Sequence, residues 1–260
     1  MTFHFFNHHR IMLRKMNYIS DQNGIINRYL KEPDHWKEHL ETSGNFIIQC
    51  AEKRNKNVAV ILGSGWLLDV PIDYLSAAFK KVYLLDIHHP VQIKHKLKKY
   101  PNVFLVETDI TGGLISEVYK LVKDFKKKKT IKDITTLNYT GFMLNVKPDF
   151  MVSLNMMNQL DILIIDYLKP FKIYNELELN TMRKMIQQSH FDFLAQRNAI
   201  LITDCEELIT DNKNIENNHS IIHIPLPTDK IKLRWKWIFD TQNSYYPEKK
   251  VVFNVVAMEL

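Results

Sequence analysis

The sequence predicts an α/β fold in which most strands of one sheet are parallel and the C-terminal strands form an antiparallel edge. Two observations support this prediction. Short continuous apolar runs, typical of strands buried on both faces, alternate with helical stretches between about residues 58 and 203. After residue 203 strand-like runs follow one another without a helix, which favours antiparallel pairing. The 260 residues suffice for one such domain and an appendage.

Five buried strands are predicted in the alternating part of the chain. They are the runs 58–62, 82–86, 103–106, 150–154 and 199–203. Helical stretches are predicted between them, at 75–79, 91–100, 114–125, 156–167 and 176–196. Because strand–helix alternation gives right-handed crossover connections, the five strands are expected to form a doubly wound parallel sheet with helices on both faces.

The N-terminal segment lies outside this alternation. Residues 1–32 are predicted to form an irregular arm, with at most a short helix near 24–30. Pro33 and Asp34 are residues that favour a helix start, and one helix or a bent pair is expected over 34–53. Residues 33–260 are then interpreted as a single domain.

Two further segments are predicted from composition and periodicity. A lysine-rich loop at about 126–147 is interpreted as a solvated insertion, with a basic lid over an acidic substrate as the alternative. The polar stretch 211–219 is interpreted as a loop. Strands are expected after it, at 221–224, 234–239 and 251–258.

The composition excludes several classes of protein. Hydrophobic residues make up 45% and charged residues 25% of the chain, which is the balance of a globular protein. Cys50 and Cys205 are too few for a disulfide framework or a four-thiolate zinc site, so a reducing, cytoplasmic location is expected. No HExxH or CxxC motif indicates a metal. The apolar runs are far shorter than the roughly 20 residues that a membrane span requires.

The net charge of +6 allows a nucleic-acid partner, but the residues that supply it argue against one. Only seven of the 35 basic residues are arginine, and the rest are lysine. Arginine is the side chain preferred for phosphate forks and base edges. A small-molecule ligand is therefore expected rather than a nucleic acid.

Glycine is scarce, yet two of the seven glycines flank Ser64 directly after the first predicted strand. A tight strand-to-helix turn needs glycine for positive φ and for close approach of a ligand to the backbone. The free amides of the next helix would then face the space above the strand ends. Gly63, Ser64 and Gly65 are therefore candidates for a ligand cradle, with an ordinary tight turn as the alternative.

Polar residues also follow the next three predicted strands. Asp86 ends the second strand, Asp109 lies just past the third, and Asn155 lies just past the fourth. The carboxyl ends of parallel strands meet at the edge where such folds bind ligands, and an acid after the second strand can accept both hydroxyls of a ribose. The joint pattern predicts a ligand site at this edge.

This arrangement resembles the class I S-adenosylmethionine-dependent methyltransferases, which have a Rossmann-like fold. The resemblance covers roughly residues 34–260 and implies a mostly parallel sheet of seven strands. The segments similar to the first four motifs of the family are VAVILGSGWLLDVP, VYLLDI, VETDIT and DFMVSLNMMNQL. The terminal VVFNVVAMEL is similar to the last strand of the family, which inserts antiparallel beside the fifth.

The resemblance implies S-adenosylmethionine as the cofactor and methyl transfer to an acceptor that the sequence does not identify, most simply a small molecule. Catalytic residues are not implied, because the sulfonium is already activated and alignment supplies much of the acceleration. Carried over by position, the implied cofactor contacts are Gly63, Ser64 and Gly65 at the methionine end, Asp86 at the ribose hydroxyls with Ile87 beside it, Asp109 and Ile110 at the adenine, and Asn155 where methyl and acceptor meet.

The first motif departs from the family pattern. An acid is common two residues before the first glycine, where this chain has Ile61, and a third glycine would fall at Leu67. These departures favour an alternative, a non-catalytic Rossmann-like module that binds a nucleotide weakly or acts as a partner subunit. A nicotinamide oxidoreductase is a third interpretation, although its GxGxxG motif would need a glycine at Leu68.

Three other groups of residues are weaker candidates. His88 and His89 follow the second strand and are interpreted as structural, with a role in the adenosine pocket as the alternative. Trp235 and Trp237 would face one side of a strand and are interpreted as core, with an aromatic wall for an acceptor as the alternative. The acids after the fifth strand either start a helix or bind an acceptor amine, namely Asp204, Glu206 and Glu207.

Overall fold

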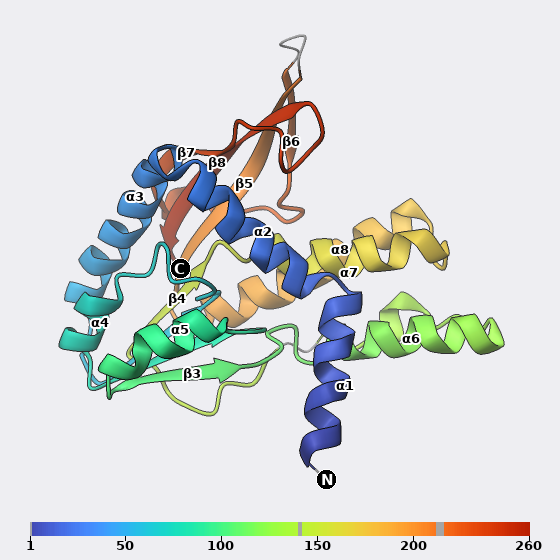
Figure 1. Cartoon of the computed structure of the whole chain (residues 1–260), viewed down its shortest axis with the longest axis horizontal. Helices are drawn as coiled ribbons and strands as arrows, with labels where there is room; N and C mark the ends of the chain where they lie inside the picture. The colour runs from blue at the N-terminus through green and yellow to red at the C-terminus, as the bar shows by residue number, and fades with distance from the viewer. Residues whose placement is uncertain (1, 140–141, 212–215) are drawn as a thin grey trace.

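The structure is a computed structural model that describes residues 2–139, 142–211 and 216–260. The described residues form one sheet of eight strands in the order β3-β2-β1-β4-β5-β8-β7, with β6 paired to β5 (Figure 1). The strands are β1 (Val58–Leu62), β2 (Lys81–Asp86), β3 (Val103–Glu107), β4 (Phe150–Leu154), β5 (Ile200–Asp211), β6 (Glu216–Ser220), β7 (Ile231–Asp240) and β8 (Lys249–Glu259).

The first five strands are parallel, as the alternation predicted. β1 pairs with β2 on one side and β4 on the other, so the strand order reverses direction at β1. β8 runs antiparallel to both β5 and β7, which confirms the antiparallel C-terminal edge. The reversal leaves a crevice at the carboxyl ends of β1 and β4, which is the place where open α/β sheets bind ligands.

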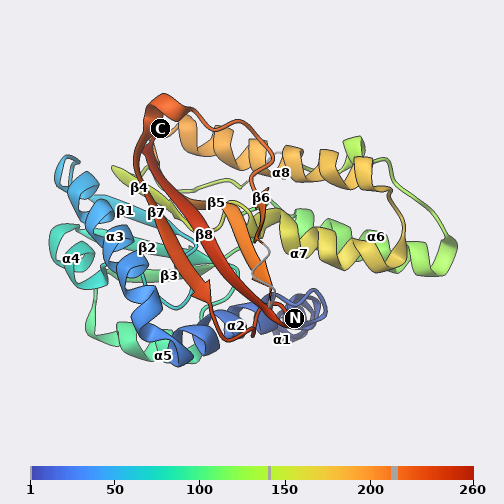
Figure 2. The ribbon, with the colours of Figure 1, turned by 90° about the horizontal axis from the view of Figure 1, so that it is seen from above.

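Helices cover both faces of the sheet (Figure 2). The residues of β1 alternate, with Ala59 and Ile61 in one core cluster and Val60 and Leu62 in the other. Helices α3 to α5 pack on the first face, and α6 to α8 pack on the second. The helices are α1 (Thr2–Lys15), α2 (Tyr18–Lys31), α3 (Pro33–Glu52), α4 (Ile72–Ala78), α5 (Val91–Lys96), α6 (Leu114–Lys128), α7 (Gln159–Leu168) and α8 (Glu176–Ala195). None of the described helices is long and apolar enough to cross a bilayer.

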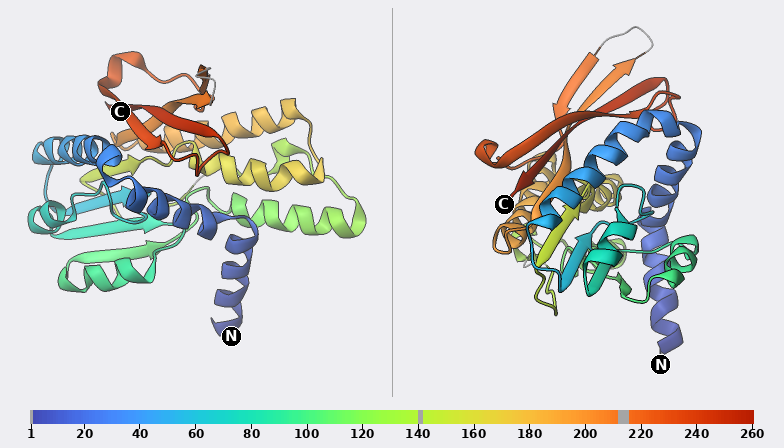
Figure 3. Two further views of the ribbon diagram at one scale, coloured as in Figure 1. Left: turned by 45° about the horizontal axis from the view of Figure 1, so that its top comes forward. Right: turned by 90° about the vertical axis from the view of Figure 1, so that its left-hand side faces the viewer.

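The N-terminal segment is helical, so the prediction of an irregular arm was wrong. Met12 and Met16 of α1 are buried in the core cluster that contains α6 and α7. Helix α2 runs from α1 to the start of α3 (Figures 1 and 3), and its Tyr18 and Tyr29 pack against different core clusters. Tertiary packing of this kind stabilises helices whose own sequence signal is weak.

The segment predicted as a loop at 126–147 begins later and is less solvated than expected. Lys126 to Lys128 form the last turn of α6, and a short 3-10 helix covers Ile134–Thr136. Ile134 and Leu137 are buried in the core, which explains why this segment does not behave as a solvated insertion. Residues 140 and 141 of the predicted loop lie outside the described residues.

The C-terminal strands also differ from the prediction. β5 continues to Asp211, and β6 covers Glu216–Ser220 within the stretch that was predicted as a loop. The predicted strand at 221–224 is wrong: Ile222 and Ile224 are buried without being in a strand. Their apolar pattern comes from packing against the core, whereas the polar residues of β5 and β6 are held by ladder hydrogen bonds.

Candidate functional site

A pocket lies above the carboxyl ends of β1 to β4, between α2 on one side and α3, α7 and β7 on the others. All eight residues that the sequence predicted as cofactor contacts line it: Gly63, Ser64, Gly65, Asp86, Ile87, Asp109, Ile110 and Asn155. The structure therefore brings together residues from four separate strand ends. Their individual roles toward a cofactor stay predictions.

The two glycines of the loop after β1 have different surroundings. Gly63 has a φ of +80°, and a Cβ there would lie 2.5 Å from the carbonyl oxygen of Leu154. Glycine is required at this position because the backbone of β4 passes so close. Gly65 has a φ of +35°, and the nearest atom to its Cβ would be Asp86 Oδ2 at 3.7 Å. Gly63 thus fits the sheet together, while Gly65 faces the pocket acid.

The loop is longer than the predicted turn. Residues 63–71 separate β1 from α4, which begins at Ile72 and has only seven residues. The expectation that the amides of the next helix face the ligand was therefore wrong. The backbone amides of Gly63 and Ser64 instead donate to the carbonyl oxygen of Leu85, at 2.9 and 3.3 Å. These bonds tie the loop to the end of β2.

Asp86 is held at the centre of the pocket by the glycine loop. Its Oδ2 accepts a hydrogen bond of 2.8 Å from the Gly65 amide, and the His88 amide lies 3.5 Å from Oδ1. Burial raises the pKa of Asp86 to about 6, although hydrogen bonds from nearby amides act in the opposite direction. The carboxylate is thus poorly solvated, and Oδ1 has only a long contact.

Asp109 lies at the β3 end of the pocket. Its Oδ1 accepts from the amide and the hydroxyl of Thr111, at 2.8 and 2.5 Å. Its Oδ2 is buried and has no hydrogen-bond partner among the described residues. The hydroxyl of Tyr18, which also lines the pocket, is buried and unpartnered as well. Burial raises the pKa of both groups. Two polar groups at this end therefore lack partners in the protein.

Asn155 lies at the β4 end in a left-handed conformation, with a φ of +47°. Its Nδ2 donates to Asp69 Oδ2 at 2.8 Å and lies 3.1 Å from His39 Nε2. The indole nitrogen of Trp235 lies 3.1 Å from His39 Nδ1. Burial lowers the pKa of His39 to about 3, so the ring is uncharged and accepts a hydrogen bond at one nitrogen only. Burial also raises the pKa of Asp69 to about 6.

Helix α2 forms the cover of the pocket, which the sequence did not predict. The side chains that line it are one helical face, at Tyr18, Asp21, Gln22 and Ile25. Gln22 Nε2 donates to the carbonyl oxygen of His88 at 2.8 Å, and Trp66 Nε1 donates to the carbonyl oxygen of Gln22 at 2.7 Å. The spacing i, i+3, i+4, i+7 was present in the sequence and could have indicated this face.

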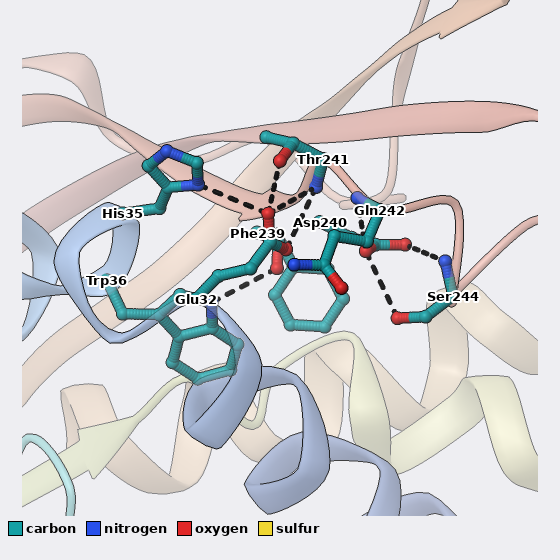
Figure 4. Close-up of polar contacts among 8 residues, drawn as sticks. All are labelled: Glu32, His35, Trp36, Phe239, Asp240, Thr241, Gln242 and Ser244. Carbon is teal, nitrogen blue, oxygen red and sulfur yellow. Dashed lines mark hydrogen bonds and ion pairs between the residues drawn. The ribbon is translucent and has the colours of Figure 1, made fainter.

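The junction between α2 and α3 is fastened to the end of β7 (Figure 4). The carboxylate of Glu32 accepts hydrogen bonds from the backbone amide of Thr241, at 3.0 Å from Oε2, and from its hydroxyl. Asp240 in turn accepts from the amide of Ser244 at 2.6 Å, which closes the turn after β7. These contacts hold the C-terminal end of α2, and with it the cover of the pocket, against the sheet.

The pocket has a strongly acidic lining. Four aspartates line it: Asp21, Asp69, Asp86 and Asp109. Among the described residues no lysine or arginine lines it. The local charge is thus opposite in sign to the net charge of +6 of the whole chain.

The weaker candidates lie in different places. His89 Nε2 lies 3.0 Å from Ser64 Oγ, and His88 Nδ1 lies 3.2 Å from Glu107, so both histidines brace the strand ends from outside the pocket lining. Trp237 lines the pocket, whereas Asp204 does not. No group of three or more metal-ligating side chains is placed to hold a metal within the described part of the chain.

No family model and no curated protein matches this sequence. Three solved structures are similar to it. The 23S rRNA methyltransferase ErmE has a TM-score of 0.34 and 11% identity, with 85% of this chain and 68% of that chain covered. The 1,6-didemethyltoxoflavin-N1-methyltransferase of Burkholderia thailandensis, with bound 1,6-didemethyltoxoflavin and S-adenosylhomocysteine, has values of 0.39, 8%, 94% and 90%. The precorrin-6y C5,15-methyltransferase of Geobacter metallireducens GS-15 has values of 0.30, 13%, 83% and 87%.

The strand order decides the fold assignment, because these similarities are low. Five parallel strands are followed by a last strand that inserts antiparallel beside the fifth, as the resemblance implied. The fold is that of the class I methyltransferases. β6 is an addition to the seven predicted strands and extends the sheet beyond β5.

Proposed function

We propose that the protein binds S-adenosylmethionine and transfers its methyl group to a small-molecule acceptor. The observation that supports this most is the charge of the pocket, which four aspartates line. Burial raises the pKa of Asp69 and Asp86 to about 6, so their ionised forms lack a nearby counterion. A ligand with a positive charge, such as a sulfonium, supplies that counterion.

The same lining argues against a nicotinamide dinucleotide. A pyrophosphate needs cationic side chains or the amides of a helix N-terminus. Among the described residues no lysine or arginine lines the pocket, and α4 begins only at Ile72, after a long loop. The glycine loop therefore suits an uncharged or cationic part of a ligand better than a phosphate.

The proposed cofactor lies across the strand ends from β3 to β4, a distance of roughly 14 Å for three strand spacings. Asp109 Oδ2 and the Tyr18 hydroxyl, both unpartnered, fit the polar edge of an adenine. Asp86 Oδ1 fits the ribose hydroxyls, since Oδ2 already accepts from Gly65. The glycine loop then lies under the methionine end, and Asn155 lies where the methyl group meets the acceptor.

Methyl transfer makes modest demands on the protein. When bound, the sulfonium supplies an activated methyl group. The chain has to hold the nucleophilic atom of the acceptor in line with the bond that breaks and to exclude water, and such alignment accounts for much of the acceleration. The cover formed by α2 fits this task, because Gln22 and Trp66 fasten it to both strand ends and loop.

One observation favours the alternative of a non-catalytic module. Ile61, at the position where the family often has an acid, is fully buried in the core cluster that contains α3 and α4. It cannot contact a ligand, so one contact common in the family is missing here. The alternative predicts weak binding of an adenine nucleoside without preference for the sulfur compounds.

Ligand-induced thermal stabilisation tests the proposal against both alternatives. A ligand at about 100 times its Kd stabilises the folded state by roughly 2.7 kcal/mol, which corresponds to a rise in Tm of about 5 °C or more for a chain of this size. We expect this rise with S-adenosylmethionine and S-adenosylhomocysteine, and no comparable rise with NAD or adenosine. Equal rises with adenosine and S-adenosylhomocysteine would support the non-catalytic module, and a rise with NAD alone would support the oxidoreductase.

A further inference from the structure

The acceptor end of the pocket, between β4 and β7, contains polar groups that define a hydrogen-bonding pattern. It is formed by Asn155, Asp69, His39 and Trp237, which all line the pocket. The inference drawn from these residues rests on the proposed function, because it concerns the molecule that receives the methyl group.

Trp237 has an unpaired hydrogen-bond donor. Its side chain stacks on the ring of His39 at 3.9 Å between centroids, and the residue is only 7% exposed. Its Nε1 is buried and has no partner among the described residues. The indole nitrogens of the other three tryptophans all have contacts: Trp36 and Trp66 donate to backbone carbonyl oxygens, and Trp235 contacts His39. A buried donor that stays unpaired is costly, so a ligand atom that accepts from it is expected here.

Asn155 has an unpaired acceptor near that donor. The residue is 8% exposed, and its Nδ2 donates to the carboxylate of Asp69. This bond fixes the amide orientation and leaves Oδ1 buried without a partner among the described residues. Both Asn155 and Trp237 contact the ring of His39, from its Nε2 and from its face, so the two unpaired atoms belong to one subsite.

We propose that the methyl acceptor is a heteroaromatic amine whose NH2 group is bonded to the carbon next to a ring nitrogen. The NH2 group donates to Asn155 Oδ1 and to the carboxylate of Asp69, and the ring nitrogen accepts from Trp237 Nε1. In the transfer the lone pair of the amine nitrogen forms the N–CH3 bond, the C–S bond breaks, and its electron pair stays on sulfur. The proton that the methylated nitrogen loses passes to Asp69 and then to water.

Other acceptor chemistries match this subsite less well. An aliphatic ammonium group has no lone pair for the indole N–H of Trp237. A carboxylate or phenolate would place a negative charge beside Asp69, which already lacks a counterion. A heteroaromatic amine satisfies the donor, the acceptor and the carboxylate together.

Three small probes test the pattern on the S-adenosylhomocysteine complex of the full chain. They are 2-aminopyridine, which has both groups, aniline, which has only the amine, and pyridine, which has only the ring nitrogen. Binding is followed by saturation-transfer NMR at a pH above the pKa of the probe ring nitrogens. We expect 2-aminopyridine to bind about tenfold more tightly than either other probe, since one additional hydrogen bond corresponds to about tenfold in affinity.

Trp237→Phe keeps an aromatic ring against His39 and removes only the donor. In this variant we expect 2-aminopyridine to lose about tenfold in affinity, while aniline binds as before and the Kd of S-adenosylhomocysteine is unchanged. Equal affinities of the three probes for the unmodified protein would overturn the proposal, and so would a Trp237→Phe variant that retains the preference. Loss of S-adenosylhomocysteine binding in the unmodified protein would instead refute the proposed function, which separates the two failures.

Discussion

Replacement of Asp86 by alanine tests the centre of the proposed site. Hydrogen bonds from ribose hydroxyls to a charged acceptor contribute on the order of 1.5–3 kcal/mol, and 1.4 kcal/mol corresponds to tenfold in affinity. Asp86→Ala should therefore weaken S-adenosylhomocysteine binding by about 10- to 100-fold, measured by isothermal titration calorimetry. The structure adds a second cause of weaker binding, because the Gly65 amide loses its acceptor at 2.8 Å and the loop is released.

The stability of the free protein should change much less than the affinity. Loss of the bond from Gly65 is destabilising, whereas removal of a poorly solvated carboxylate, whose pKa burial raises to about 6, is stabilising. Because these effects oppose each other, the free energy of unfolding should change by less than about 1.5 kcal/mol in urea titrations.

Asp73→Ala is the matched control for this experiment. Asp73 is an aspartate in the first turn of α4, its side chain is 83% exposed, and it does not line the pocket. Its replacement should leave the affinity for S-adenosylhomocysteine unchanged. Equal small effects at Asp73 and Asp86 would mean that Asp86 does not contact the ligand. Loss of folding in Asp86→Ala would mean that the carboxylate acts chiefly to hold the glycine loop.

Two further predictions concern the glycines and the pH. Gly63→Ala should lower the Tm by several degrees, because its Cβ would lie 2.5 Å from the carbonyl oxygen of Leu154, whereas Gly65→Val should keep a cooperative thermal transition and lose affinity for S-adenosylhomocysteine. The opposite assignment of these effects would contradict the roles given to the two glycines. Burial raises the pKa of Asp69 and Asp86 to about 6, so both gain negative charge as the pH rises through 6. Calorimetry at constant ionic strength should then show the affinity of cationic S-adenosylmethionine rising roughly tenfold relative to S-adenosylhomocysteine between about pH 5 and pH 7. A ratio that is independent of pH would show that these carboxylates do not sense the sulfonium.

The parallel part of the fold could be predicted from the sequence because its strands are buried on both faces. The run VAVIL forms β1 as predicted, and four of its five residues are buried. Apolar continuity over five residues followed by a glycine leaves few alternatives to a buried strand. The carboxyl-edge rule then brought Asp86, Asp109 and Asn155 to one pocket without any knowledge of side-chain contacts.

The N-terminal helices could not be predicted in the same way because their burial depends on the rest of the chain. Helix α2 has only one fully buried residue, Tyr18, and its remaining contacts lie along the edge of the sheet. Amphipathic periodicity is weak in a helix that is covered only in part. The role of α2 as the pocket cover therefore became visible only once β1 to β4 were assembled beneath it.

The polar details of the site were inaccessible for a different reason. Sequence spacing placed Trp235 and Trp237 on one side of a strand, but it could not distinguish an indole that contacts His39 from one that lacks a partner. That difference arises from α3, which brings His39 against β7. Hydrogen-bond satisfaction of buried groups depends on three-dimensional contacts between distant segments, and residue pattern contains no signal for it.

The acidity of the pocket links binding of the proposed cofactor to release of its product. A sulfonium provides the counterion that Asp69 and Asp86 lack, and its attraction is strong because the pocket is poorly solvated. Transfer of the methyl group converts the sulfonium into an uncharged thioether, so the electrostatic part of the attraction is lost in the same step. The carboxylates then favour exchange of the product for a new cation. A pocket lined by arginine or lysine would have the opposite preference, which is why the four aspartates, in a chain with a net charge of +6, are the feature most specific to a sulfonium cofactor.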